Sequence, residues 1–283
     1  KSRLVPACPA PRAAARGFDK RAESPYILTP NLEVPNPINK ECVEMNLDEI
    51  KEKIARACRI IDMEGVTQDG RGHISYLHPD GDKVLIPGHL HDYGKAIADV
   101  QAEDIVTMDF DGNVLEGKHP EPMGEFYVYV EAFRAREDVK SVAHFHPPYA
   151  NIVAASGTSI MPIARDGCVF YDGVPVYEGY PLYVGNREMG EEVVAALGDK
   201  KAILHKGHGA FVVGGNVEET LFRSVSLEKA ARTQVYAAIL GELSPIPVES
   251  MTDREKHPDD HIVDDFFGYY SGKMEKLERQ AQA

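Results

Sequence analysis

Two Asp-Gly pairs, Asp80-Gly81 and Asp111-Gly112, place the strongest constraint on how this chain folds. Each pair lies between two short apolar runs of strand character, and Asp-Gly between such runs favours a two-residue hairpin turn. The four runs are residues 73–77, 83–87, 105–110 and 114–116. Because a hairpin joins antiparallel neighbours, the sequence predicts a sheet that is largely antiparallel.

Helical patterns alternate with further strand-like runs over the rest of the chain. Asn46 and Asn216 each stand three residues before a glutamate, a capping pattern that opens helices ending at Gly65 and Gly241. More helices are predicted over 124–137, from 147 and over 186–197, and more strands over 139–146, 174–177, 202–204 and 210–213. This order predicts one mixed α/β domain over 46–243. An irregular arm over 1–45 precedes it, and a tail over 244–283 with helical character follows it.

Charge and cysteine usage limit the class of protein. The 283 residues carry a formal net charge of −14, which argues against a partner with a phosphate surface, nucleic acid or anionic membrane. No apolar run is long enough for a membrane-spanning helix. The four cysteines are scattered and form no paired motif, so we expect a reducing, cytoplasmic setting.

Histidines occur in two patterns that suit metal binding. His144 and His146 are two apart in a predicted strand, so their side chains share one face. His208 lies between Gly207 and Gly209 in a turn, where an imidazole is poor core material. Three imidazoles with an open fourth position predict a catalytic metal site. Zn²⁺ is the default ion, and Mn²⁺, Fe²⁺ and Co²⁺ are alternatives.

Glu125 is a candidate acid or base for such a metal site. It opens the predicted helix that precedes the His144 strand, where the helix dipole favours a carboxylate. The alternative is a solvated first-turn glutamate without any function. Residue type and position alone favour that alternative.

Together these motifs resemble the class II aldolase/adducin family, because Glu125 stands 19 positions before His144, as in that family. The resemblance spans about residues 48–243. It implies a three-layer α/β/α domain with a central, mostly antiparallel sheet, and a divalent metal on His144, His146 and His208. It also implies an acid/base role for Glu125, and a homotetramer with active sites at subunit interfaces.

Two departures from the sugar-phosphate aldolases of this family point to a substrate without phosphate. Met123 and Gly124 stand where those enzymes have phosphate-binding serines. A GH-x-S loop replaces their GN-x-S, which makes His73 and Ser75 candidate substrate-binding residues. His73 suits a carboxylate if it is protonated or donates a hydrogen bond. A purely structural role for His73 is the alternative.

The combined expectation is a metal-dependent carbon–carbon lyase that acts on a small, non-phosphorylated hydroxy or oxo carboxylic acid, with decarboxylation favoured. Retro-aldol cleavage uses the same physics, because both reactions leave negative charge beside a carbonyl. Two different hypotheses are an Fe(II)-dependent oxygenase and a non-catalytic, adducin-like module. The aromatic residues of the tail predict either packing on their own chain or a lid over a neighbouring site.

Overall fold

An eight-stranded sheet organises the part of the chain that the computed structural model describes, residues 46–91, 94–179 and 182–281. The chain divides into the units Lys1–Glu44 and Met45–Ala283, and the described residues belong to the second. The predicted arm over 1–45 therefore lies outside them. The strands are β1 (Gly72–Leu77), β2 (Lys83–Pro87), β3 (Ile105–Asp109), β4 (Val114–Glu116), β5 (Ser141–Phe145), β6 (Val176–Tyr177), β7 (Ala202–His205) and β8 (Gly209–Gly214).

The sheet is mostly antiparallel, as predicted. Its order is β4-β3-β2-β1-β5-β8-β7-β6, and among these pairs only β6 and β7 run parallel. Both Asp-Gly hairpins form, as β1–β2 and β3–β4. At the centre of the sheet, His144 of β5 lies opposite His73 on one side and Phe211 on the other. Strand β5 is shorter than predicted, so His146 lies just beyond its end.

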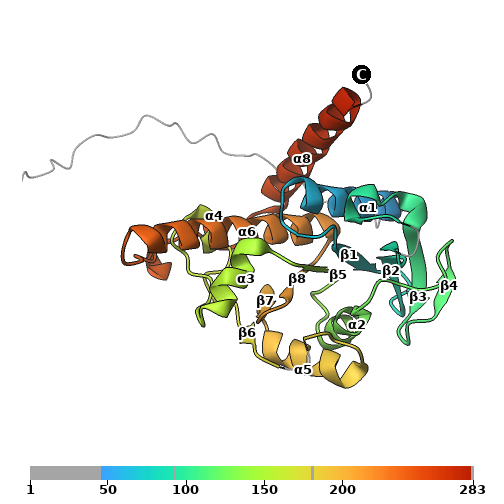
Figure 1. The fold of residues 1–283 in the computed structure, drawn as a ribbon, viewed down its shortest axis with the longest axis horizontal. Coiled ribbons are helices and arrows are strands. Elements are labelled where there is room, and N and C mark those ends of the chain that lie inside the picture. The colour runs from blue at the N-terminus through green and yellow to red at the C-terminus, as the bar shows by residue number, and fades with distance from the viewer. Residues whose placement is uncertain (1–45, 92–93, 180–181, 282–283) are drawn as a thin grey trace, which may run out of the picture. The chain divides into compact units, whose positions relative to one another are not determined.

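Helices cover both faces of this sheet, which makes the domain the expected three-layer α/β/α structure (Figure 1). On one face α1 packs on β1, and α6 packs on β5 and β8 together with α3. On the other face α2 packs on β5 and α5 packs on β7. The helices are α1 (Leu47–Met63), α2 (Phe126–Ala135), α3 (Pro148–Ala155), α4 (Arg165–Cys168), α5 (Arg187–Leu197), α6 (Val217–Leu240), α7 (Asp253–Lys256) and α8 (Asp260–Ala281), with 3-10 turns at Ile97–Asp99, Ala102–Asp104 and Val248–Ser250.

The strand alternation divides the apolar core into two clusters. Ile74 and Phe145 belong to the cluster under α1 and α6, and Val142 and Phe211 belong to the cluster under α2 and α5. Side chains two apart in a strand share a face, so His144 projects into the α2–α5 side with Val142. His144 of β5 therefore lies on the side of the sheet where α2 begins.

The C-terminal segment packs on its own chain. Phe266 of α8 contacts Phe222 of α6 with ring centroids 5.0 Å apart. Val263, Tyr270 and Met274 of the same helix are buried. Two of the tail aromatics, Phe266 and Tyr270, thus serve packing within the chain. Among the described residues, no helix combines the length and apolarity needed to cross a membrane.

Candidate metal centre

Four predicted site residues meet at the end of β5, although they come from three distant parts of the chain. His144 lies in β5 and His146 follows it, while His208 lies in the turn between β7 and β8. Glu125 is the residue before α2. One ligand atom from each of these residues lies within 4.8 Å of the others. The pairing of β5 with β8 produces this convergence, because it aligns the ends that carry the histidines.

The orientation of His144 is set by the neighbouring strand. Its Nδ1 lies 3.1 Å from the carbonyl oxygen of Ala210, and since a carbonyl only accepts, Nδ1 carries the donated proton. In the neutral ring Nε2 is then a lone-pair acceptor. This atom is buried, makes no hydrogen bond with any described residue, and lies 2.9 Å from Oε2 of Glu125. A positive charge, either a proton or a metal ion, is therefore required between these two atoms.

His208 is held in the same way from the other side. Its Nδ1 bonds the carbonyl oxygen of Leu182, and Asn151 donates from Nδ2 to its backbone oxygen at 3.0 Å. Its Nε2 lies 3.1 Å from Nε2 of His146 and 3.4 Å from Oε2 of Glu125. Fixing one imidazole nitrogen on a carbonyl leaves the other facing the ligand position, which is the usual support of metal-binding histidines.

Gly209 allows the turn to approach the histidine strand. A Cβ atom at this position would lie 2.5 Å from the carbonyl oxygen of Phe145 and 3.0 Å from ring atoms of both His144 and His146. Only a glycine fits between backbone and ring atoms at such distances. The glycine after His208 is thus required by the geometry of the cluster.

Glu125 is buried in the site, and the alternative of a solvated glutamate is wrong. Its backbone has the left-handed φ of 64°, an uncommon conformation for a residue other than glycine. Oε1 accepts the Val184 N–H at 3.0 Å, so Oε2 is left to face His144 and His208. Burial opposes ionisation, yet the two histidines hold the pKa of Glu125 well below its usual value. The side chain is therefore a carboxylate.

These donors fit a divalent cation. Burial and the neighbouring histidines lower the pKa of His146 to about 4, so its imidazole is neutral. Burial also opposes protonation of His208, but the hydrogen bond and charge of Glu125 raise its pKa. A cation that binds here displaces the proton that His208 tends to hold, and the neutral imidazoles beside the carboxylate then form a nitrogen and oxygen donor set of the kind that Zn²⁺ and other first-row divalent ions take.

The other two predicted site residues, His73 and Ser75, are not part of this cluster. His73 is buried, its Nε2 lies 2.5 Å from the Tyr129 hydroxyl, and its ring centroid lies 6.2 Å from that of His144. Burial lowers the pKa of His73 to about 3, which favours a neutral ring at the edge of the site. Ser75 is fully buried and donates its hydroxyl to the carbonyl oxygen of Val142. Its strand partner is Val142, whereas that of His73 is His144, so Ser75 lies farther from the cluster.

Several supporting residues had no signal in the sequence. The carbonyl of Leu182 and the N–H of Val184 act through the backbone, which every residue type provides. Thr67 accepts the N–H of His146 at 3.2 Å, and its loop shows no periodicity. Asn151 is the exception, since a lone amide within the apolar helix α3 is a detectable signal.

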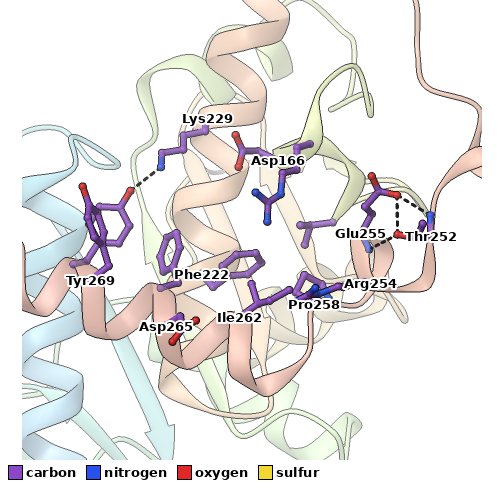
Figure 2. A pocket seen from close by; sticks show the side chains of 14 residues that line it. Asp166, Phe222, Lys229, Thr252, Arg254, Glu255, Pro258, Ile262, Asp265 and Tyr269 are labelled. Atoms are coloured by element: carbon purple, nitrogen blue, oxygen red, sulfur yellow. Dashed lines mark hydrogen bonds between the residues drawn. The ribbon is translucent and has the colours of Figure 1, made fainter.

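A cavity of about 650 Å³ lies elsewhere in the domain, between α4, α6, α7 and α8 (Figure 2). Lys229 and Phe222 of α6 border it, and Lys229 donates to the hydroxyl of Tyr270 at 2.7 Å. Arg254 of α7 and Asp265 of α8 also line this cavity. None of the four cluster residues lines this cavity, so it is separate from the candidate metal centre.

Comparison with known proteins places the chain among related enzymes. Residues 52–235 match the family described as "Class II Aldolase and Adducin N-terminal domain". The chain is 33% identical over 210 residues to a 3,4-dihydroxyphthalate decarboxylase of Rhodococcus jostii, covering 70% of this chain and 84% of that relative. It is 27% identical to a 4-hydroxy-3-prenylphenylpyruvate oxygenase/4-hydroxy-3-prenylbenzoate synthase of Streptomyces roseochromogenus, covering 71% and 72%. The crystal structure of an aldolase II superfamily protein from Pseudomonas syringae superposes with a TM-score of 0.70 at 24% identity, covering 83% of this chain and 96% of that one.

Proposed function

Because the chain belongs to the class II aldolase/adducin family and is a metal-dependent lyase of that family, we propose that it decarboxylates a small, non-phosphorylated hydroxy or oxo carboxylic acid. The substrate class extends to aromatic carboxylates, since the relative from Rhodococcus jostii is a decarboxylase of a dihydroxyphthalate. Retro-aldol cleavage is the nearest rival reaction.

The observation that carries this proposal is the convergence of four potential ligand atoms, one of them the buried Nε2 of His144, which has no hydrogen bond to the described residues. We propose His144, His146 and His208 as the ligands of a divalent metal, with Zn²⁺ as the default ion. When bound, the metal supplies a positive charge that stabilises the electrons released from the broken C–C bond.

Glu125 is the residue we propose for proton transfer. Its Oε1 is held by Val184 and its Oε2 is directed into the cluster, so one oxygen orients the side chain and the other is available to the substrate. After loss of carbon dioxide, the substrate carbon that carried the carboxylate must take up a proton. As a carboxylate, Glu125 first takes a proton from a substrate hydroxyl and then gives that proton to this carbon, so that it ends again as a carboxylate.

The residues around Glu125 support a substrate without phosphate. A Cβ atom at Gly124 would lie 2.8 Å from the hydroxyl oxygen of Tyr183, so the fold leaves no room for a serine there without moving the tyrosine. Met123 is largely buried and offers no hydroxyl. His73 remains a proposed substrate contact, as a neutral donor: its buried Nδ1 has no partner among the described residues. We propose Ser75 as a support of that contact, because its hydroxyl bonds Val142 within the same β1–β5 pairing that places His73 opposite His144.

Further features complete the proposal. The domain over 46–243 carries the activity, with an irregular arm over 1–45 and a tail over 244–283. The protein acts as a homotetramer with active sites at subunit interfaces, in the cytoplasm. Its partner is a small-molecule carboxylate rather than nucleic acid or membrane, in keeping with the net charge of −14.

The test is an assay of purified, metal-analysed protein with 3,4-dihydroxyphthalate as the first substrate. We expect release of carbon dioxide without oxygen consumption, and no release by His144→Ala. Aldehyde release from a hydroxy acid would favour the aldolase. Strict oxygen dependence would favour an Fe(II) oxygenase, the second candidate, which the relative from Streptomyces supports. Efficient turnover of a sugar phosphate would refute the proposal.

A further inference from the structure

The loop that precedes β1 carries a rigidly held arginine beside the metal centre. Arg71 lies between Gly70 and Gly72, which have φ values of 63° and 123°. A Cβ at Gly70 would lie 2.8 Å from Cβ of Ala96, and one at Gly72 would lie 3.0 Å from the carbonyl oxygen of His144. Both glycines are therefore required, and they fix the backbone on either side of Arg71.

Thr67 ties this loop directly to the ligand segment. Its hydroxyl accepts the backbone N–H of His146 and donates to the carbonyl oxygen of Arg71. The N–H of Arg71 bonds the carbonyl oxygen of Gln68 at 3.3 Å, and the carbonyl oxygen of Gly70 accepts the N–H of Ile97 at 2.9 Å. A single hydroxyl thus sets the position of Arg71 relative to His146.

The side chain of Arg71, in contrast, is available for a ligand. It is exposed, and within the described ranges its guanidinium has neither a hydrogen bond nor an ion pair. Its positive charge is nevertheless near enough to His146 to contribute to the lowered pKa of that imidazole. In a chain with a net charge of −14, an anionic substrate needs a local cation near the reacting centre to offset the general repulsion.

We propose that Arg71 binds a carboxylate of the substrate at a point separate from the group held by the metal centre. A guanidinium pairs with a carboxylate through two parallel hydrogen bonds, which orients as well as attracts it. The substrate class is thereby narrowed to acids that carry an anionic group beside the metal-chelating oxygens. This inference rests on the proposed function for the metal centre.

Binding of two non-reacting probes tests the proposal independently of turnover. Protein loaded with Zn²⁺ is titrated calorimetrically with catechol and with 3,4-dihydroxybenzoate, which share the chelating diol and differ by the carboxylate. We expect the wild type to bind 3,4-dihydroxybenzoate about tenfold more tightly, the gain from one exposed charge-assisted pair. Arg71→Gln should lose this preference and keep its zinc, because the guanidinium is outside the ligand set. Arg71→Lys should recover part of it.

A charge-matched control separates local contact from net charge. Arg279→Gln removes the same charge from the exposed end of α8 and should keep the full preference. Equal affinity of the wild type for both probes, or an unchanged preference in Arg71→Gln, would overturn the role of Arg71. A wild type that prefers 3,4-dihydroxybenzoate but decarboxylates no acid would leave that role in place and refute the proposed function instead.

Discussion

Glu228 of α6 provides the sharpest test of how the helix layer supports the site. Its carboxylate accepts the backbone N–H groups of Tyr149 and Ala150, at 2.8 and 3.0 Å, and so caps α3. Helix α3 in turn carries Asn151, which holds the backbone oxygen of His208. Burial raises the pKa of Glu228 to about 7, although both N–H groups and Arg232 oppose the shift.

The sign of the pH effect follows from this raised pKa. Between the ordinary value of 4.5 and about 7, the folded protein keeps a proton on Glu228 that the unfolded chain has released. The free energy of unfolding therefore falls as the pH rises through this window. At about 1.4 kcal/mol per pH unit, the difference between the two pKa values sets an upper limit of about 3 kcal/mol.

The variant Glu228→Gln removes the titration while keeping the size of the side chain. Urea unfolding of both proteins at pH 5, 6, 7 and 8, at one protein concentration, measures the difference between their free energies of unfolding. We expect the wild type to lose up to about 2.5 kcal/mol of stability relative to the variant from pH 5 to pH 8, because the rest of the limit lies below pH 5. Glu249→Gln, at an exposed position, should show no such trend. A difference between wild type and Glu228→Gln that stays constant with pH would refute the reasoning.

Three further changes test the metal centre directly. Glu125→Gln should bind metal and lower kcat by about 10²- to 10⁴-fold, because it removes the proton-transfer group. His144→Ala should lose most of the bound metal, measured by elemental analysis of the purified protein, since one of three proposed ligands is gone. Gly209→Ala should lower both metal content and melting temperature, because the new Cβ would lie 2.5 Å from the carbonyl oxygen of Phe145.

Two of these changes have a matched control within the chain. His261→Ala alters an exposed histidine of α8 and should keep its metal. Gly268→Ala adds a Cβ where nothing lies within 4 Å, and it should keep the metal content without lowering the melting temperature, because alanine favours a helix interior more than glycine does. Near-normal kcat in Glu125→Gln, or full metal content in His144→Ala, would contradict the assigned roles.

The sheet was predictable from the sequence where its determinants are local. The turns at Asp80-Gly81 and Asp111-Gly112 specify the hairpins β1–β2 and β3–β4 without reference to the rest of the chain. The caps Asn46 and Asn216 likewise begin α1 and α6 at the expected residues, each accepting a backbone N–H of its own first turn. Such features depend on neighbours within a few residues.

The surroundings of the site were less predictable because they depend on tertiary placement. Glu125 is buried with a left-handed φ, and its Oε1 is held by Val184, a residue of a distant loop without periodicity. The neutral state of His73 follows from the layer of α2 that covers it. Ser75 shows the same limit, because its pairing with the carbonyl oxygen of Val142 is a matter of strand register. Residue types and spacing were sufficient to identify the three histidines, but not the residues and backbone groups that hold them in place.

The central position of β5 in the sheet has a consequence for the order of folding. His146 and His208 are 62 residues apart, and they meet only through the pairing of β5 with β8. Loop-closure entropy makes such long-range pairing slow, whereas the local hairpins close early. We therefore expect the histidine cluster to form late, so that a cation that requires all three imidazoles stabilises only chains whose central strands are already joined. During refolding, uptake of the ion would follow the closure of the sheet and not the collapse that precedes it.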